Sequence, residues 1–379
     1  MPPRLPAQRL VLVGAGHAQL FVLAELARHP PPPGIEVMLV APESHAIYSG
    51  MVPGWIAGHY RLDQCAIDLR PLARRARVRW IAARALRLDP SARQLDTEAG
   101  AIEFDWLSIA CGSAIDAAGI RGAGRHGLAP RPAQGLVDGW TRFAKDCRAA
   151  PASRDGVAVI GGGAAGVELA LAIAQATGNP HGRGSAGAIT LVAGNGLMQG
   201  FAARARSRCE RLLRQRAIAV LPQAATSIDG DGVDLAGGGR LSARLVVLAS
   251  GPAPQPWLQA SGLACDDGGF ILVDRHLRST SHPAIFAAGD CASIEGAPRA
   301  RSGVYAVRAG PVLAANLKAS LEQAPLRTHR PQRRALYLLS TGDRHAIGCR
   351  GPIVFEGDWV WRWKDRIDRR FVALFSTGA

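Results

Sequence analysis

The sequence has no C-x-x-C pair and no grouping of cysteine and histidine at metal-ligand spacing. Its seven cysteines are dispersed over 379 residues. An odd number of scattered cysteines is typical of reduced thiols in a cytosolic compartment, and metal ligands would need closer, regular spacing. We therefore expect a cytoplasmic protein with no bound metal ion.

Acidic residues are few relative to basic ones. The chain has 30 Asp and Glu against 45 Lys and Arg, which gives a formal net charge of +15. Such a charge attracts nucleic acid, anionic lipid or a polyanionic cofactor, although an arginine-rich composition also follows from a genome rich in G and C. No recognition motif accompanies the charge, so we expect no nucleic-acid partner.

The sequence also lacks an unbroken hydrophobic run long enough to span a bilayer. Residues 10–27 and 157–174 come nearest, but each contains a glycine-rich turn and an internal polar residue, His17 in the first and Glu168 in the second. A buried strand followed by a helix explains such segments better than a membrane span or an export signal does. We expect neither a transmembrane helix nor a signal peptide.

What the sequence does contain is a strand, turn and helix pattern at residues 157–170, VAVIGGGAAGVELA. A short apolar run is followed by Gly161, Gly163 and Gly166 in G-x-G-x-x-G spacing and then by an apolar helical pattern. The first glycine permits a tight turn, the second lets a pyrophosphate approach the backbone, and the third lets the helix pack closely on the strand. The helix N-terminus then faces the anion, so the motif predicts a dinucleotide phosphate site.

Residues 9–27 repeat this pattern near the N-terminus, with Gly14 and Gly16 after an apolar strand. Gln19 occupies the third glycine position, which we expect to widen the contact between helix and strand slightly. A second strand at 35–40 ends at Ala41, where a dinucleotide fold usually carries an acid for the ribose hydroxyls. Glu43 is the nearest acid, and it is either a ribose ligand or a simple loop carboxylate.

The segment 45–60, HAIYSGMVPGWIAGHY, is dense in glycine, serine and aromatic residues, and we predict a loop there. Loops at the carboxyl ends of parallel strands bind ligands, so we place this segment over the reactive part of the first nucleotide. Residues 104–111 form a predicted buried strand that ends at Gly112. A linker rich in glycine, alanine and proline follows at 117–134.

The second nucleotide unit also lacks an acid at the end of its second strand, which is predicted at 188–192 and followed by Ala193. An acid there would favour NADH. Its absence, together with Arg204, Arg206 and Arg208, leaves NADPH open because an arginine can hold a 2′-phosphate. The alternative is that these arginines form the exposed face of a helix.

Five motifs occur in a specific order along the chain. They are GAGHAQ near the N-terminus, IACGS at 109–113, GGGAAGVELA at 161–170, LASGPAP at 248–254 and HPAIFAAGDCAS at 282–293. Over about residues 8–320 this set resembles the two-dinucleotide-domain pyridine nucleotide-disulfide oxidoreductase superfamily. The resemblance implies FAD held noncovalently, NAD(P)H as hydride donor, and an aspartate, here Asp290, on the ribityl chain of FAD.

The resemblance also implies an α/β fold with two Rossmann-like dinucleotide-binding domains, the second inserted into the first. We expect an FAD-binding domain at 1–115 and 252–325 and an NAD(P)H-binding domain at 116–251. A small C-terminal region at 326–379 would carry an amphipathic helix and face a partner or a membrane.

Carried over to matching positions, the resemblance predicts the residues of both cofactor sites. For FAD they are Gly14, Gly16, His17, Ala18, Glu43, Ser49, Gly50, Ala110, Gly112, Gly289 and Asp290. For NAD(P)H they are Gly161, Gly163, Ala164, Gly166, Glu168 and Gly251. Glu168 matches the glutamate of the family's G-x-x-G-x-E run, and we expect it near the nicotinamide in a catalytic role.

Motifs that are missing, as well as motifs that are present, indicate which subgroup of the superfamily the chain resembles. Residues 45–60 carry no redox-active cysteine pair, so dithiol chemistry is disfavoured. The chain resembles the type II NADH dehydrogenases and, more closely, the flavoproteins associated with selenide, water dikinase, through HAIYSGMVPG and the stretches 302–317 and 338–371. The A-Q-x-x-x-Q quinone element is missing where Gly303, Val304 and Arg308 stand, which counts against quinone reduction. The expected acceptor is a small molecule, of which a quinone is one candidate.

Two other functions stay open at this point. One is a sulfide:quinone reductase-like enzyme in which Cys147 and Cys349 would act as the separated cysteines. The other is a nonenzymatic flavin-bearing partner of a selenium or sulfur pathway enzyme.

The C-terminal stretch 359–375 places Trp359, Trp363, Ile367, Phe371 and Phe375 at successive i+4 steps. Five cations lie off this stripe, namely Arg362, Lys364, Arg366, Arg369 and Arg370. Such a basic amphipathic helix predicts peripheral attachment to the inner face of the cytoplasmic membrane. The alternative is that the stripe packs against the body of the protein or against a second copy in a homodimer.

Overall fold

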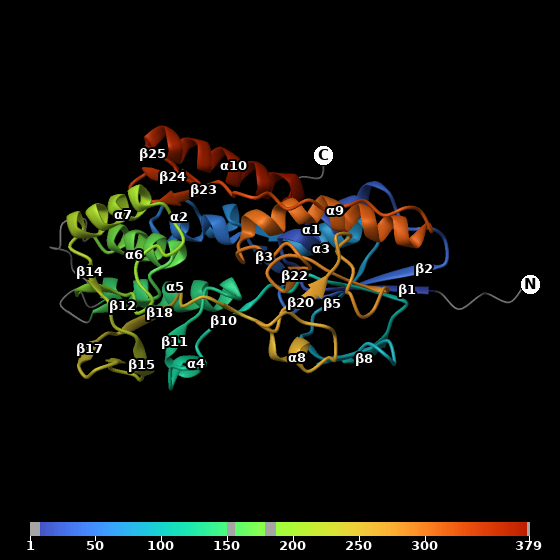
Figure 1. Cartoon of the computed structure of the whole chain (residues 1–379), viewed down its shortest axis with the longest axis horizontal. Helices are drawn as coiled ribbons and strands as arrows, with labels where there is room; N and C mark the ends of the chain where they lie inside the picture. The colour runs from blue at the N-terminus through green and yellow to red at the C-terminus, as the bar shows by residue number, and fades with distance from the viewer. Residues whose placement is uncertain (1–7, 150–155, 179–186, 377–379) are drawn as a thin grey trace, which may run out of the picture.

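The computed structural model describes residues 8–149, 156–178 and 187–376, and its two halves are each built on a parallel five-stranded sheet (Figure 1). The first sheet has the order β21 (Ile285–Ala287), β9 (Trp106–Ile109), β1 (Gln8–Val13), β2 (Ile35–Val40) and β5 (Arg79–Ile81). The second has the order β11 (Gly127–Leu128), β18 (Leu245–Leu248), β12 (Val157–Ile160), β13 (Ile189–Val192) and β14 (Ala219–Leu221). All five strands of the second sheet fall between β9 and β21 in sequence. The second Rossmann-like unit is therefore inserted into the first, and the predicted fold class is confirmed.

Helices bury the faces of both sheets, as the apolar strands require. In the first half α1 (His17–Arg28) packs along α9 (Gly303–Leu321). Gly310 makes this possible, since a Cβ there would lie 2.2 Å from the ring of Phe21. In the second half α6 (Ala164–Ala176) and α7 (Ala203–Gln215) cover β12 and β13, whose residues are all buried.

The predicted linker at 117–134 is partly wrong, because it contains α4 (Ala123–His126) and β11, and α5 (Ala133–Ala149) begins before it ends. β11 joins the edge of the second sheet beside β18. Gly127 permits this close approach, since a Cβ there would lie 2.7 Å from the Leu248 side chain. Where the chain leaves and re-enters the first half, β10 (Ala114–Ile115) pairs with β19 (Pro252–Ala253).

The predicted loop at 45–60 is also wrong in part. It contains β3 (His45–Ile47), the 3₁₀ turn η1 (Ser49–Met51) and the short helix α2 (Val52–Ile56). Val52 and Ile56 are buried in the apolar core of the second half, so tertiary packing stabilises a helix that glycine and proline disfavour locally.

Smaller elements complete both halves. They are η2 (Leu62–Gln64), β4 (Ala66–Asp68), α3 (Leu69–Arg75), β6 (Ala85–Asp89), β7 (Gln94–Thr97), β8 (Gly100–Glu103), β15 (Ala225–Ile228), β16 (Gly232–Leu235), β17 (Arg240–Ser242), α8 (Pro256–Gln259), β20 (Ile271–Val273) and β22 (Ala292–Ile294).

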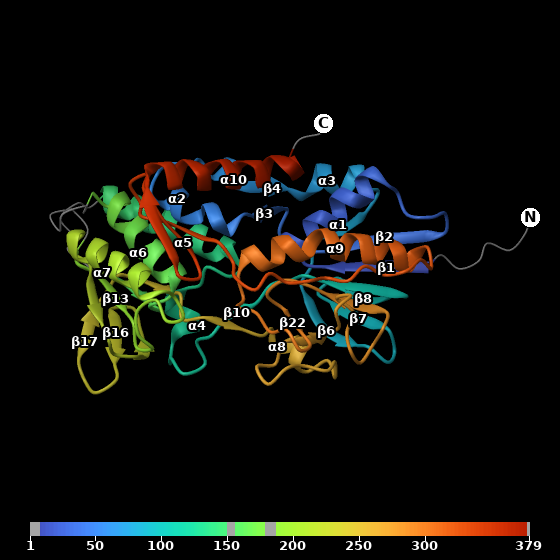
Figure 2. The same cartoon turned by 45° about the horizontal axis from the view of Figure 1, so that its top comes forward.

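The C-terminal region bridges the two halves. Its antiparallel sheet of β23 (Tyr337–Ser340), β24 (Ala346–Arg350) and β25 (Ile353–Gly357) lies by α6 and α7, and α10 (Asp358–Ser376) runs along the top of both halves (Figure 2). α10 contacts β4 of the first half, and its last turns pack into the core of that half through Phe371 and Phe375.

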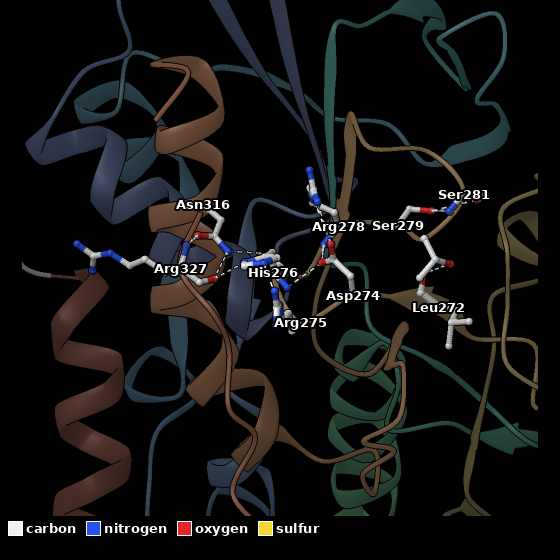
Figure 3. Close-up of polar contacts among 10 residues, drawn as sticks. Leu272, Asp274, Arg275, His276, Arg278, Ser279, Ser281, Asn316 and Arg327 are labelled. Carbon is white, nitrogen blue, oxygen red and sulfur yellow. Dashed lines mark hydrogen bonds and ion pairs between the residues drawn. The ribbon is translucent and has the colours of Figure 1, made fainter. Parts of the chain in front are cut away.

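A buried asparagine fixes the segment that leads from α9 to this region (Figure 3). The Asn316 side chain is fully buried; its Nδ2 donates to the carbonyl oxygens of His276 at 2.8 Å and Arg327 at 2.9 Å. Its Oδ1 accepts from the Arg327 backbone N–H at 2.7 Å. These bonds satisfy three backbone groups that have no strand partner there.

Replacing Asn316 with alanine should lower the free energy of unfolding by about 3 kcal/mol, because it removes three hydrogen bonds of a buried side chain to the backbone of His276 and Arg327. Urea denaturation measures this difference. K318A, a half-exposed position on the same helix, is the matched control and should change the free energy by less than about 0.5 kcal/mol. Equal effects of the two substitutions would contradict this account of the α9 anchor.

Candidate functional site

A cavity of about 510 Å³ opens at the carboxyl ends of β1, β2 and β9. Among the predicted FAD residues, its lining includes Gly14, Gly16, His17, Ala18, Glu43, Ser49, Ala110, Gly112, Gly289 and Asp290. Gly50 is not in the lining, and its carbonyl oxygen instead accepts from Lys364 Nζ at 2.6 Å. The cavity is of the size that holds large organic ligands, and its lining comes from many separate stretches of sequence between Val13 and Ala306.

The first glycine turn forms one wall of this cavity. Gly14 has φ +81°, and a Cβ there would lie 2.4 Å from the Cys111 Cα; at Gly16 it would lie 2.3 Å from the Ala110 carbonyl oxygen. The turn is therefore held directly against the end of β9, with the N-terminus of α1 at the cavity. Gln19, at the third glycine position, is fully buried and accepts from Ser108 Oγ at 3.1 Å.

Few charges enter the cavity. Burial, aided by the charge of Arg131, lowers the pKa of His17 to about 4, so His17 is neutral at physiological pH. Asp290 Oδ2 lies 2.9 Å from Arg131 Nη1. Burial raises the pKa of Asp290 although Arg131 opposes this. A helix N-terminus behind a glycine-rich turn suits a pyrophosphate, and the mostly buried Asp290 carboxylate suits the hydroxyls of a ribityl chain. These residues therefore fit FAD.

The second glycine turn has the same construction between β12 and α6. Gly161 has φ +125°, and a Cβ there would lie 2.0 Å from the Ala249 carbonyl oxygen; at Gly166 it would lie 1.8 Å from the Gly161 oxygen. Gly163, by contrast, faces open space, as does Gly251 with φ +127°. Ala164 begins the helix. The backbone is thus open where an NAD(P)H pyrophosphate would approach.

The arginines after β13 are mostly committed to packing. On α7, Arg211 Nη2 lies 2.9 Å from Glu356 of β25, and Arg208 Nε lies 3.8 Å from it. Arg204 is exposed in the first turn, and Ala193 is buried at the end of β13. Arg204, Arg208 and Arg211 thus share one face of α7, with Arg204 exposed and the other two at Glu356, and the choice between NADH and NADPH stays a prediction.

Glu168 is a half-buried residue of α6. It lies between the glycine turn at 161–166 and the C-terminal sheet of β23 to β25. The Ser340 backbone N–H donates to its Oε1 at 2.8 Å. Burial raises the pKa of Glu168 to about 7, against the opposing charge of Lys364 and the Ser340 hydrogen bond. Glu168 can therefore take up or release a proton at physiological pH.

Lys364 of α10 is the buried cation beside Glu168. Its Nζ donates to Asp368 Oδ2 at 2.6 Å and to the Gly50 carbonyl oxygen. Burial alone would lower the pKa of Lys364, but the charges of Asp368 and Glu168 raise it above its ordinary value. Lys364 is thus charged and buried, so its predicted place among the membrane-facing cations of the amphipathic helix is wrong.

Tyr48 connects this group to the flavin cavity. Its hydroxyl hydrogen-bonds Asp368, and its ring lines the cavity, stacked on Phe371 with centroids 4.4 Å apart. His17 meets the Tyr48 ring edge-on at 5.1 Å. Hydrogen bonds therefore link Lys364 through Asp368 to Tyr48, and Glu168 interacts with this group through the charge of Lys364.

Sequence reasoning missed Lys364, Asp368 and Tyr48 as members of the site. A signal was present, because Val360, Lys364, Asp368, Phe371 and Phe375 follow one another at helical spacing and form the buried face. The charged residues at its centre made that face look exposed.

The predicted apolar stripe of α10 is divided by the fold. Trp359, Trp363 and Ile367 are 51%, 39% and 41% exposed, whereas Phe371 and Phe375 are 7% and 1% exposed. Packing against the body thus accounts for the last two turns, and the first three positions stay at the surface. Trp359 also stacks on Phe355 of β25 and on Trp363.

The cysteines proposed for sulfide chemistry lie elsewhere. Cys349 is buried in β24 and Cys147 lies on α5, and neither belongs to the cavity lining. Within the described residues, no group of three or more metal-binding side chains comes together. No helix in this part of the chain has the length and hydropathy to cross a bilayer.

Comparisons with known proteins agree with this architecture. The family model described as pyridine nucleotide-disulphide oxidoreductase matches residues 8–310. An NADH dehydrogenase-like protein of Mycobacterium tuberculosis is 26% identical over 300 residues, covering 75% of this chain and 73% of the relative.

Two solved structures share the fold along nearly the whole chain. The sulfide:quinone oxidoreductase of Aquifex aeolicus has a TM-score of 0.76 at 19% identity, covering 97% of this chain and 92% of that one. NDH2 of Plasmodium falciparum, solved in complex with NADH, has a TM-score of 0.77 at 14% identity, covering 97% of both chains. Since the family model spans most of the sequence, the chain belongs to the pyridine nucleotide-disulphide oxidoreductase family, as an NADH dehydrogenase-like member that uses FAD and NAD(P)H.

Proposed function

We propose that the chain oxidises NAD(P)H, with hydride passing to FAD and electrons then to a quinone or another small acceptor. The observation that supports this proposal most is the pair of glycine-rich turns, one at the end of β1 and one at the end of β12. The titratable carboxylate of Glu168 lies on α6, just after the second turn. We propose the division inferred from sequence, with FAD bound by 1–115 and 252–325 and NAD(P)H by 116–251. The association with selenide, water dikinase stays a prediction.

FAD, when bound, would supply the redox chemistry, which is to accept hydride and pass on electrons. The chain supplies position: Gly14, Gly16 and the start of α1 would hold the pyrophosphate, and Asp290 the ribityl hydroxyls. Gly161, Gly163 and Gly251 would hold the second dinucleotide in the same manner.

We assign Glu168 the role of a proton donor during acceptor reduction. Its pKa of about 7 lets it hold a proton at physiological pH, and Lys364 stabilises the carboxylate left after release. Lys364 is in turn hydrogen-bonded to Asp368, which bonds Tyr48 at the cavity wall. A quinone takes up two protons with two electrons, so a buried proton reservoir suits that class of acceptor.

The exposed part of α10 supports peripheral contact with an anionic membrane. Trp359, Trp363 and Ile367 provide apolar contact, and Arg362, Arg366 and Arg370 are exposed with no ion pair within the described chain. Each such cation contributes about 1 kcal/mol near an anionic leaflet. Two chains meeting through the same stripe in a homodimer is the competing arrangement.

Anaerobic mixing of the FAD-loaded protein with NADH or NADPH should bleach the flavin absorbance. The donor that reduces the flavin faster is the cosubstrate, a choice that the sequence does not settle because Ala193 replaces the acid that would favour NADH. Flavin that both donors leave oxidised would contradict the proposed activity and favour a passive carrier.

E168Q should lower turnover by about one hundredfold and remove the decline in rate that the wild type shows as pH rises through about 7. K364M should shift that decline to higher pH, because the Lys364 charge normally lowers the pKa of Glu168. The pH profile of kcat measures both effects.

K318M is the matched control for K364M and should keep the wild-type profile. If K364M does not fold because Asp368 is left unpaired, the double variant K364M/D368L removes both buried charges. A wild-type profile in E168Q would contradict the role of Glu168.

Flotation with anionic vesicles tests the membrane contact. Wild-type protein should float at low salt and be released at high salt, whereas W359S/W363S/I367S should stay soluble. V220S removes an apolar side chain exposed on β14 and should float like the wild type. Deleting α10 is unsuitable because it would also remove buried side chains. If wild-type protein stays soluble at low salt, a soluble acceptor or a homodimer replaces this proposal.

A further inference from the structure

Two thiols lie close together at the flavin cavity, Cys111 in its lining and Cys291 buried outside it. Cys111 follows β9 and lines the cavity, and Cys291 follows β21, the neighbouring parallel strand. Their side chains hydrogen-bond each other. The Cys291 thiol also lies 3.4 Å from the Ile109 carbonyl oxygen and 3.3 Å from that of Ala288. The paired ends of β9 and β21 therefore bring the two thiols close together.

The contact changes how easily the pair loses a proton. The hydrogen bond from Cys111 lowers the pKa of Cys291, and the same hydrogen bond together with burial raises the pKa of Cys111. One proton thus leaves the pair more readily while the other is retained. A thiolate is the form that oxidants attack.

We propose that Cys111 and Cys291 are a thiol-oxidation site that a peroxide reaches through the flavin cavity, and that bound FAD shields it. One sulfur attacks the peroxide, the O–O bond breaks, and a sulfenic acid and one water form. The second sulfur displaces the sulfenic hydroxyl as water. In sum, two thiols and one hydrogen peroxide give one disulfide and two waters.

The position of Cys111 connects this oxidation to cofactor binding. A Cβ on Gly14 would lie 2.4 Å from the Cys111 Cα, so the first phosphate turn rests directly on this residue. Drawing Cys111 toward Cys291 disturbs the wall against which Gly14 packs. The disulfide therefore weakens FAD binding, and FAD in turn restricts access of peroxide to the pair.

The test uses the full chain, stripped of FAD or reloaded with it, treated with hydrogen peroxide. Thiols are counted in denaturant, and unreduced peptides are analysed by mass spectrometry. The stripped protein should fall from seven thiols to five, regain them with dithiothreitol, and yield a linked Cys111–Cys291 peptide. With FAD bound, the loss should be about tenfold slower.

Substitutions separate this pair from the other cysteines. C111T and C291A should give no linked peptide, and C111S replaces C111T if that variant does not fold. C265S, which removes a half-buried thiol outside the cavity lining, should still lose two thiols. No linked peptide in the stripped wild type, or equal rates with and without FAD, would overturn the proposal. Thiol counting needs no turnover, so its result is independent of whether NAD(P)H reduces the flavin.

Discussion

The buried ammonium of Lys364 is the constraint on which the arrangement of the site depends. An unpaired buried charge costs several kcal/mol, so Lys364 must find partners when α10 packs. It finds Asp368 on its own helix, the Gly50 carbonyl oxygen in the first half and the charge of Glu168 in the second. These partners come from three parts of the chain, and satisfying them fixes how the C-terminal region sits on both halves.

The cofactor sites rest on a different constraint, which is steric. Gly14, Gly16, Gly161 and Gly166 each stand where a Cβ would collide with a neighbouring backbone, at 1.8 to 2.4 Å. Close packing of turn on strand points each helix N-terminus at the end of its sheet. The same physical solution, used once per sheet, gives each half a turn of the kind that binds a dinucleotide phosphate.

Sequence reasoning succeeded where local chemistry determines structure. The glycine spacing and the buried strands depend on backbone sterics and apolar runs that are visible in the sequence. The return of the chain to the first sheet at 285–287 was predicted from the family resemblance alone. The domain boundaries inferred from motif order fall beside the β10 and β19 pairing, although the division itself stays a prediction.

The failures come from contacts between distant segments. α2 exists because Val52 and Ile56 are buried in the core of the second half, and β11 exists because Gly127 lets it approach β18. Lys364 was predicted to be one of five membrane-facing cations because it lies off the apolar stripe of α10. Its burial depends on Asp368 one turn away and on Gly50, which is 314 residues away. Local patterns carry no information about that last partner.

Infrared difference spectroscopy of the Glu168 carboxyl group tests the central claim most directly. The protonated C=O band, identified by its loss in E168Q, should titrate with a midpoint of about 7 in the wild type. In K364M the midpoint should move to higher pH, because a stabilising charge is gone. A Glu168 that titrates near its ordinary value of 4.5, or a midpoint unchanged in K364M, would contradict the account.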